Sequence, residues 1–315
     1  MTDFPTASRP LRLGTRASPL ARAQANMAVA ALIAAHGFDP QALEIVPITA
    51  AGDKVQDRAL AEIGGKALWT RELDAMLDAG VIDVAVHSLK DVETIRDSRF
   101  VLGAMLERGD PRDRLVVCEG LEAPTIADLP PGAKLGTSSP RRAAQVRKLR
   151  PDIKTPLLRG NVATRLSKLV SGEMDATLLA AAGLERLGMH EIGTVQPVDI
   201  LVPAASQGAI GVEARAEDGA MLALLAAIDH GDTRRAVVAE RAFLAGVGGD
   251  CQSPVAAHAH YLPDGRLRLV AELFSEDGGA HVAGETMVED EVSAARLAQK
   301  LLSEAPVAVR RLFAP

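Results

Sequence analysis

The chain has 315 residues, of which 48% are hydrophobic, and a formal net charge of -6 at pH 7. This length allows two or three domains with substantial cores. The negative charge argues against general nucleic-acid binding, and no stretch reaches the roughly 18 consecutive apolar residues of a membrane span. Residues 1–10 lack the layout of a secretory signal and are expected to form a flexible tail, so we expect a cytoplasmic protein.

Strands and helices are expected to alternate at the start of the chain. Ser18 can cap a helix that takes Pro19 at its first position and stops at Gly37. The pattern predicts strands over 11–14, 43–48 and from 81 onward, and helices over 20–36 and 67–79. This order predicts a parallel α/β sheet.

A charged Gly/Pro linker at 107–114 indicates a domain boundary. Beyond it the pattern predicts strands over 115–118, 134–136, 155–158, 176–179, 199–203 and 209–213, and helices over 140–149, 162–171 and 181–187. The last hundred residues predict a small α+β domain, with helices over 219–230, 233–244 and 292–305 and strands over 255–261, 267–274 and 281–288.

The stretch 81–91 begins as a buried strand and ends in polar residues, among them His87, Ser88, Lys90 and Asp91. Ligands of open α/β sheets bind outside the carboxyl ends of strands. We therefore expect a site here. The alternative is an ordinary solvated strand end with a Lys/Asp pair.

Three predicted turns, at 14–19, 136–142 and 159–165, combine a strand end, an arginine and a helix N-terminus. Such turns offer backbone N–H groups, a positive dipole end and a guanidinium fork, which suit a carboxylate or phosphate. Nine basic residues and one acid, Asp152, lie between 136 and 170. The sequence therefore predicts an anion-binding cleft, in which Asp91 must serve a cationic or N–H-bearing part of the ligand.

Other patterns are less decisive. Gly64-Gly65-Lys66 lacks the remaining residues of a phosphate-binding P-loop, and Trp69 after it is either an aromatic flap or a core anchor. Two cysteines cannot form a disulfide framework, and no Cys/His cluster has zinc-ligand spacing. Cys118 follows a strand and is expected to be a buried inert thiol, whereas Cys251 lies in a glycine-rich loop and is either reactive or incidental.

Seven stretches, in order along nearly the whole chain after the tail, resemble the hydroxymethylbilane synthase (porphobilinogen deaminase) family. They are GTRASPLA at 14–21, GGK at 64–66, HSLKDV at 87–92, GTSS with two arginines at 136–142, RGNV with TRL at 159–166, AAAGLERLG at 180–188, and Cys251 with Pro254.

The resemblance implies a transferase of porphyrin and heme biosynthesis. It would condense four porphobilinogen molecules head to tail, with release of ammonia, into the linear tetrapyrrole hydroxymethylbilane on a dipyrromethane primer. The implied fold is α/β: two periplasmic-binding-protein-like (type II) α/β domains around a cleft plus a small C-terminal α+β domain. The implied divisions are a tail at 1–10, domain 1 at 11–106 with a return at 205–215, domain 2 at 107–204, and domain 3 at 216–315, which carries the cofactor cysteine.

The resemblance also assigns residues. Asp91 would be the catalytic carboxylate, which hydrogen-bonds pyrrole N–H groups and stabilises developing positive charge, and Cys251 would carry the cofactor through a thioether. The remaining cofactor ligands would be Lys90, Asp91, Ser138, Ser139, Arg141, Arg142, Arg165 and Arg186. The substrate ligands would be Arg16, Ser18, Lys66, Trp69, Arg159, Arg165 and Arg186. We expect a monomer with porphobilinogen as its small-molecule partner and no bound metal, membrane or nucleic acid.

Five residues depart from the family pattern. Trp69 replaces a phenylalanine, Glu62 replaces a basic residue of some relatives, Glu93 replaces a common proline, and Ser206 and Asp250 replace residues that are more often glycine. These departures concern loop closure and chain movement more than the core chemistry. The competing hypotheses are a non-catalytic small-anion binding protein of the same shape, which gives Cys251 and Asp91 no task, and an enzyme that has lost its activity.

Overall fold

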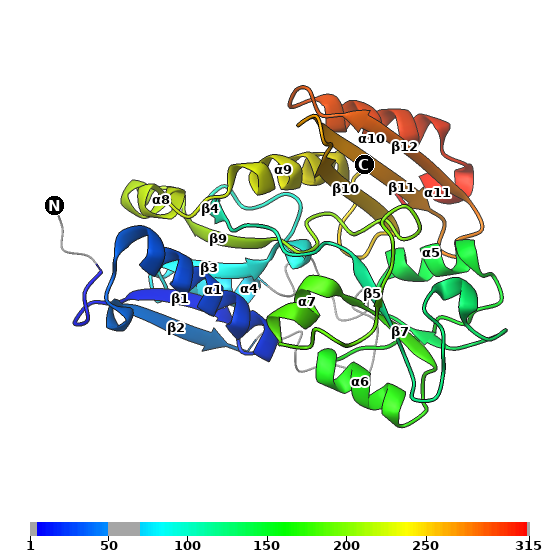
Figure 1. Ribbon diagram of the computed structural model, residues 1–315. Helices are drawn as coiled ribbons and strands as arrows, with labels where there is room; N and C mark the ends of the chain where they lie inside the picture. The colour runs from blue at the N-terminus through cyan, green and yellow to red at the C-terminus, as the bar shows by residue number, and fades with distance from the viewer. Residues whose placement is uncertain (1–4, 50–69, 314–315) are drawn as a thin grey trace. The chain divides into compact units, whose positions relative to one another are not determined.

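The computed structural model describes residues 5–49 and 70–313 (Figure 1). These residues fall into two compact units, one formed by 5–49, 70–109 and 209–234 and the other by 110–208 and 235–313. Within the described ranges, every helix is too short or too polar to cross a membrane.

The first unit contains a five-stranded sheet in the order β2-β1-β3-β9-β4 (Figure 1). Its strands are β1 (Leu11–Arg16), β2 (Leu43–Ile48), β3 (Val84–Ser88), β4 (Phe100–Met105) and β9 (Ile210–Arg215). β1 pairs in parallel with β2 and β3, whereas β9 runs antiparallel to β3 and β4. The sheet is therefore mixed rather than wholly parallel, because the chain returns from residue 210 to fill the place between β3 and β4.

Three helices, α1 (Pro19–His36), α4 (Arg71–Asp78) and α8 (Gly219–Ala226), and two short 3-10 helices, η1 (Pro40–Ala42) and η2 (Leu89–Asp91), complete this unit. The predicted boundaries of α1 are confirmed. The Ser18 hydroxyl accepts a hydrogen bond from the N–H of Ala21, and Gly37 ends the helix with a left-handed φ of 69°. A residue without a Cβ suits this conformation.

The second unit contains a four-stranded sheet in the order β6-β7-β5-β8. Its elements are β5 (Asp113–Val117), η3 (Ile126–Asp128), β6 (Leu135–Gly136), α5 (Pro140–Leu149), α6 (Val162–Val170), β7 (Ala176–Ala180), α7 (Ala181–Arg186) and β8 (Thr194–Val195).

Two strands predicted for this unit are wrong. Residues 155–158 contribute only an isolated bridge between Thr137 and Leu157, since Pro156 has no N–H to donate to a ladder. The stretch 199–203 forms a turn, in which the N–H groups of Ile200 and Leu201 both donate to the carbonyl of Pro197.

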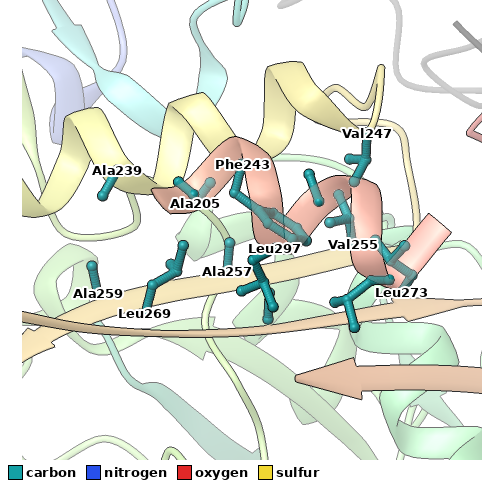
Figure 2. Close-up of a cluster of buried hydrophobic side chains, with 14 of the residues drawn as sticks. Ala205, Ala239, Phe243, Val247, Val255, Ala257, Ala259, Leu269, Leu273 and Leu297 are labelled. Atoms are coloured by element: carbon teal, nitrogen blue, oxygen red, sulfur yellow. The ribbon is translucent and has the colours of Figure 1, made fainter. Parts of the chain in front are cut away.

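The same unit holds a three-stranded antiparallel sheet made of β10 (Val255–Tyr261), β11 (Leu267–Phe274) and β12 (His281–Met287). The helices α9 (Gly231–Gly246), α10 (Ser293–Glu304) and α11 (Val307–Arg310) accompany it. Figure 2 shows Phe243 of α9 packed with Leu297 of α10 over the strands, in a core that also includes Leu269 and Leu273. The predicted α/β class and the small C-terminal α+β region are thus confirmed, whereas the division into three domains stays a prediction.

Candidate active site

A pocket lies in the first unit at the carboxyl ends of the parallel strands β1 and β3. It encloses about 510 Å³ of space that is open to solvent, and Arg16, Ser18, His87, Ser88, Lys90 and Asp91 are among its lining residues. A pocket therefore lies at the strand ends, where the pattern of 81–91 predicted a site, and its functional role stays a prediction.

The fold of this region explains which side chains reach the pocket. Arg16 is the last residue of β1, and Ser18 begins α1. Lys90 and Asp91 belong to η2, a single 3-10 turn that follows β3. Leu89, the first residue of η2, is fully buried, and its N–H donates to the carbonyl of Ala209 at 3.1 Å. This anchor leaves the next two residues, Lys90 and Asp91, half-exposed at the pocket.

The chemistry of the pocket combines opposite charges. Two cations, Arg16 and Lys90, and the N-terminus of the 18-residue α1 favour the carboxylate groups of a ligand. Asp91 is a carboxylate in the same pocket and suits a cationic or N–H-bearing part of that ligand. The structure thus brings together Arg16, Ser18, Lys90 and Asp91, the four described residues of this pocket that the family resemblance assigned, while Lys66, Trp69 and Glu62 lie outside the described residues.

In the second unit, Arg165 and Ser138 are brought together. Arg165 donates from Nη2 to the Ser138 hydroxyl at 3.2 Å and from Nε to the carbonyl of Gly160 at 3.0 Å. Asn161 caps α6 by accepting from the N–H of Thr164 at 2.9 Å. Gly160 has a φ of 105°, and a Cβ there would lie 2.6 Å from a methyl carbon of Thr164, so this turn requires glycine.

Arg141 and Arg142, which were predicted to bind an anion, bind a carboxylate of the protein instead. Their Nη2 atoms each donate at 2.7 Å to a different oxygen of Asp113, and all three residues are buried. Burial alone would raise the pKa of Asp113, but the charges and hydrogen bonds of Arg142 and Arg141 lower it. The two guanidinium groups therefore lie inside the unit, and their direct contact with a cofactor stays a prediction.

Much of the basic segment is neutralised locally. Lys148, Arg150 and Lys168 form ion pairs with Glu272, Asp152 and Glu173 at 2.7 to 3.0 Å. Together with the pair on Asp113, five of the nine basic residues meet an acid. Arg159 is 8% exposed and Arg165 binds Ser138, so contact of either arginine with an anion stays a prediction.

Arg186, Ser139 and Cys251 complete the predicted set. Arg186 donates to the carbonyl of Gly208 at 2.6 Å, and burial lowers its pKa to about 10. Ser139 caps α5 by accepting from the N–H of Arg142. Cys251 is exposed in its loop, where the adjacent Asp250 carboxylate accepts from the N–H of Gln252 and the hydroxyl of Ser253.

An exposed thiol fits a covalently attached cofactor, because the sulfur can be reached from solvent. Asp250 directs its charge into the loop, where Gln252 and Ser253 bind it. Cys118 is half-buried rather than buried as predicted. Among the described residues, no group of three His, Cys, Asp or Glu side chains is placed to hold a metal ion.

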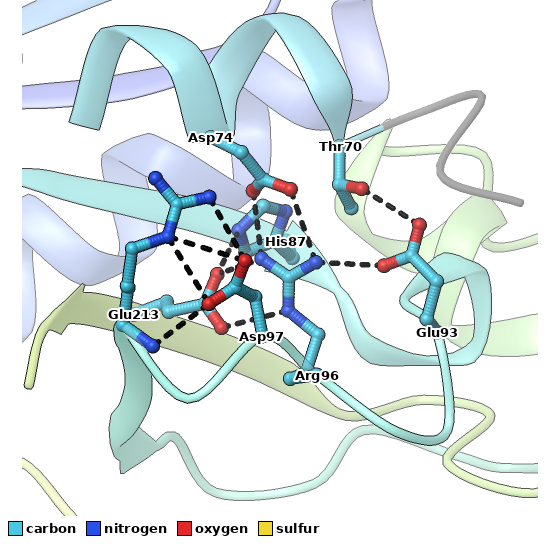
Figure 3. Close-up of polar contacts among 8 residues, drawn as sticks. Thr70, Asp74, His87, Glu93, Arg96, Asp97 and Glu213 are labelled. Carbon is cyan, nitrogen blue, oxygen red and sulfur yellow. Dashed lines mark hydrogen bonds and ion pairs between the residues drawn. The ribbon is translucent and has the colours of Figure 1, made fainter. Parts of the chain in front are cut away.

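Several residues around the pocket escaped the sequence prediction. Gln24 and Thr70 line it, and Glu213 of β9 lies 3.3 Å from the predicted residue His87. Arg96 binds Glu213 as well (Figure 3). These side chains come from segments far apart in the sequence and share no spacing. The only signal was Glu93, which departs from the family's proline and is now seen to bind Arg96 at 2.8 Å.

The fold is α/β, and among the described lining residues of its pocket are two cations, Arg16 and Lys90, and one carboxylate, Asp91, a combination that suits a ligand with both acidic and N–H-bearing groups. The chain matches the family model for the porphobilinogen deaminase dipyromethane cofactor binding domain over residues 11–223, and the model for the porphobilinogen deaminase C-terminal domain over residues 234–305. The chain belongs to the porphobilinogen deaminase family. The predicted resemblance, the transferase activity in tetrapyrrole synthesis and the dipyrromethane cofactor are confirmed.

Relatives of full length carry the same name. The porphobilinogen deaminase of Sphingopyxis alaskensis is 71% identical over 314 residues, which cover 100% of each chain. That of Paracoccus denitrificans is 47% identical over 311 residues, which cover 97% of this chain and 98% of the relative.

Solved structures similar to this chain are remote. An ancestral arginine-binding protein bound to arginine has a TM-score of 0.39 and 17% identity, and covers 70% of this chain and 90% of its own. The L-cystine solute receptor of Neisseria gonorrhoeae has a TM-score of 0.36 and 15% identity, and covers 77% and 94%.

Proposed function

We propose that the pocket of the first unit is where porphobilinogen reacts, and that Asp91 is the catalytic residue. The reaction joins four porphobilinogen molecules head to tail and releases one ammonia for each. Each step passes through positive charge beside a pyrrole nitrogen. A fixed carboxylate stabilises that charge by its field and by accepting the pyrrole N–H, which typically accelerates such steps by about 10² to 10⁴.

The other pocket residues bind rather than react. Arg16 and Lys90 bind the acetate and propionate arms of porphobilinogen, and Ser18 with the N-terminus of α1 adds hydrogen-bond donors. The observation that carries the proposal is that Asp91, the carboxylate among the described lining residues, shares a pocket with both of these cations. A site that only binds anions gains nothing from a carboxylate there. We extend substrate binding to Lys66, Trp69, Arg159, Arg165 and Arg186.

The dipyrromethane cofactor supplies a primer ring to which the first substrate is joined. We propose that Cys251 holds it by a thioether, because a thiolate is the soft nucleophile suited to an electrophilic methylene carbon. Lys90, Asp91, Ser138, Ser139, Arg141, Arg142, Arg165 and Arg186 would bind its acidic arms and N–H groups. The cytoplasmic location and the monomeric state stay predictions.

The catalytic role of Asp91 is tested by Asp91→Asn. The variant keeps the shape and loses the charge, so we expect kcat to fall by about a thousandfold while the unfolding transition stays in place. The matched control is Asp97→Asn, since Asp97 lies six residues further on and its side chain is 43% exposed. Near-normal turnover of Asp91→Asn would remove Asp91 from the reaction and would favour an enzyme that does not depend on this pocket.

The cofactor attachment is tested by intact mass. Protein made with porphobilinogen available should be heavier than its sequence by one dipyrrole unit, and Cys251→Ser should have the mass of the bare chain. Cys118→Ser is the matched control and should keep the added mass. A bare wild-type mass under these conditions would instead support the non-catalytic anion-binding protein.

A further inference from the structure

In the segment between η2 and β4, residues 92–99, Arg96 binds three carboxylates. Arg96 donates from Nε to Glu213 at 2.9 Å, from Nη2 to Glu213 and to Asp74 at 2.7 Å each, and from Nη1 to Asp74 at 3.1 Å and to Glu93 at 2.8 Å. All of its nitrogens are thus in use. We name Arg96, Asp74, Glu93 and Glu213 the Arg96 cluster.

The three carboxylates of the Arg96 cluster come from different elements (Figure 3). Asp74 belongs to α4, Glu213 to β9, and Glu93 to the same segment as Arg96. Glu93 also accepts from the hydroxyl of Thr70, and His87 at the end of β3 lies 3.3 Å from Glu213. The cluster therefore ties this segment to α4, whose Leu73 lines the pocket, and to β9, which pairs with β3.

Charge makes the cluster depend on Arg96. The exposed fractions of the side chains are 11% for Arg96, 19% for Asp74, 17% for Glu93 and 0% for Glu213. Burial alone would raise the pKa of Glu213, but the nearby His87 and the hydrogen bonds and charge of Arg96 lower it to about 2. Without the guanidinium, three crowded carboxylates would repel one another, and the segment would have to move.

In the chain, Glu93 and Arg96 of the cluster follow directly after η2, the turn that carries Asp91. Asp91 precedes Glu93 by two residues, and between them Val92 is 6% exposed and donates its N–H to the carbonyl of Leu89. Leu89 itself is held by Ala209. Lys90 and Asp91 are thus fixed on one side by Ala209, the residue before β9, and on the other by the Arg96 cluster, whose Glu213 belongs to β9.

We infer that Arg96 is a positioning residue of the reaction: by binding Asp74, Glu93 and Glu213 it sets the place of Asp91 in the pocket. The inference rests on the proposed role of Asp91. A misplacement of about 1 Å at a reacting group costs about a hundredfold in rate, whereas carboxylate binding by Arg16 and Lys90 tolerates more movement because it is electrostatic. Arg96 therefore acts on kcat rather than on KM.

The test compares Arg96→Met, Arg96→Lys and Glu93→Gln with a matched control, Arg99→Met. Arg99 lies on the same segment with its side chain 55% exposed, and binds Asp97 and Asp78 instead. We expect kcat to fall about a hundredfold in Arg96→Met and about tenfold in Glu93→Gln, with KM changed less than about threefold. Arg96→Lys should recover part of kcat, and Arg99→Met should match the wild type.

Stability and coupling separate positioning from a merely structural role. Each kcat is measured at a temperature where the unfolding curve of that variant shows it fully folded, and the intact mass reports the cofactor load. Adding Glu93→Gln to Arg96→Met should lower kcat no further, since both act through one contact. If Arg96→Met does not fold, Glu93→Gln alone carries the test.

Two outcomes overturn the inference while leaving the proposed function in place. One is a wild-type kcat in folded Arg96→Met or Glu93→Gln while Asp91→Asn is inactive. The other is a rise in KM without a fall in kcat, which would make the cluster part of substrate binding. Activity in Asp91→Asn would instead overturn the proposed function, on which the inference depends.

Discussion

Ser206 adopts a backbone conformation that normally favours glycine. Among the described residues it is the non-glycine residue with a positive φ, 64°. Its N–H donates to the buried carboxylate of Glu240 at 2.6 Å, which holds the turn in this shape. Its hydroxyl is buried and has no hydrogen-bond partner among the described residues. The side chain therefore costs stability twice, once in the backbone and once in desolvation.

Ser206→Gly should stabilise the protein by about 1 kcal/mol, because glycine adopts this φ without strain and removes the buried hydroxyl. Urea unfolding curves measure the change. Ser206→Ala is the control, because it removes the hydroxyl but keeps the strained backbone, and should gain less. A glycine variant less stable than both would show that the turn is not strained.

The residue scale also shows where sequence reasoning stops. The cap at Ser18 and the stop at Gly37 could be predicted because both depend on neighbours within a turn. The direction of Arg141 and Arg142 could not, since their partner Asp113 lies 28 and 29 residues away and turns both guanidinium groups inward. A basic turn predicts charge, but only the fold decides whether that charge faces a ligand.

At the scale of elements, Phe243 is the aromatic side chain through which α9 packs into the core beside the three-stranded sheet. Phe243 is fully buried among Leu297, Val255 and Leu273 (Figure 2). Phe243→Ala should lower the free energy of unfolding by about 3 to 5 kcal/mol, the sum of lost burial and a cavity.

The same helix supplies the matched control for this prediction. Val238 is 49% exposed, so Val238→Ala should change stability by less than about 0.5 kcal/mol. Chemical unfolding followed by circular dichroism measures both variants. Equal effects of the two substitutions would contradict the packing role given to Phe243.

The elements themselves were largely predictable where one pattern decided them. The strands and helices around the three-stranded sheet follow clear periodicity, and their order was predicted correctly. The strand predicted over 199–203 was wrong because its apolar residues Leu201 and Val202 are buried, at 0% and 5% exposure, without belonging to a strand. Burial and strand pairing look alike in an apolar run, and the choice between them depends on contacts that are distant in sequence.

At the scale of the whole molecule, each unit holds a buried carboxylate that arginine keeps ionised, Asp113 in one and Glu213 in the other. Their pKa values are lowered, for Glu213 from 4.5 to about 2. A lowered pKa adds stability that is complete above the ordinary value and is lost as the pH falls through the lowered one. The protein should therefore lose stability in acid between pH 4.5 and about 2.

Glu213→Gln isolates one of these contributions. The variant should be less stable than the wild type by about 3 kcal/mol at pH 7, and this difference should shrink as the pH falls from 4.5 toward 2. Urea unfolding at a series of pH values measures it. A difference that stays constant down to pH 2 would show that Glu213 does not act through its charge.

The position of β9 has a consequence for the newborn polypeptide. β4 ends at Met105 and β9 begins at Ile210, so a ribosome makes β3 and β4 long before the strand that joins them. Until then, both present open edges that invite wrong partners, a state that chaperones exist to cover. Asp91 lacks Ala209 and Glu213 for the same interval. A translation product that ends before residue 209 therefore contains Asp91 but lacks the residues that fix its position.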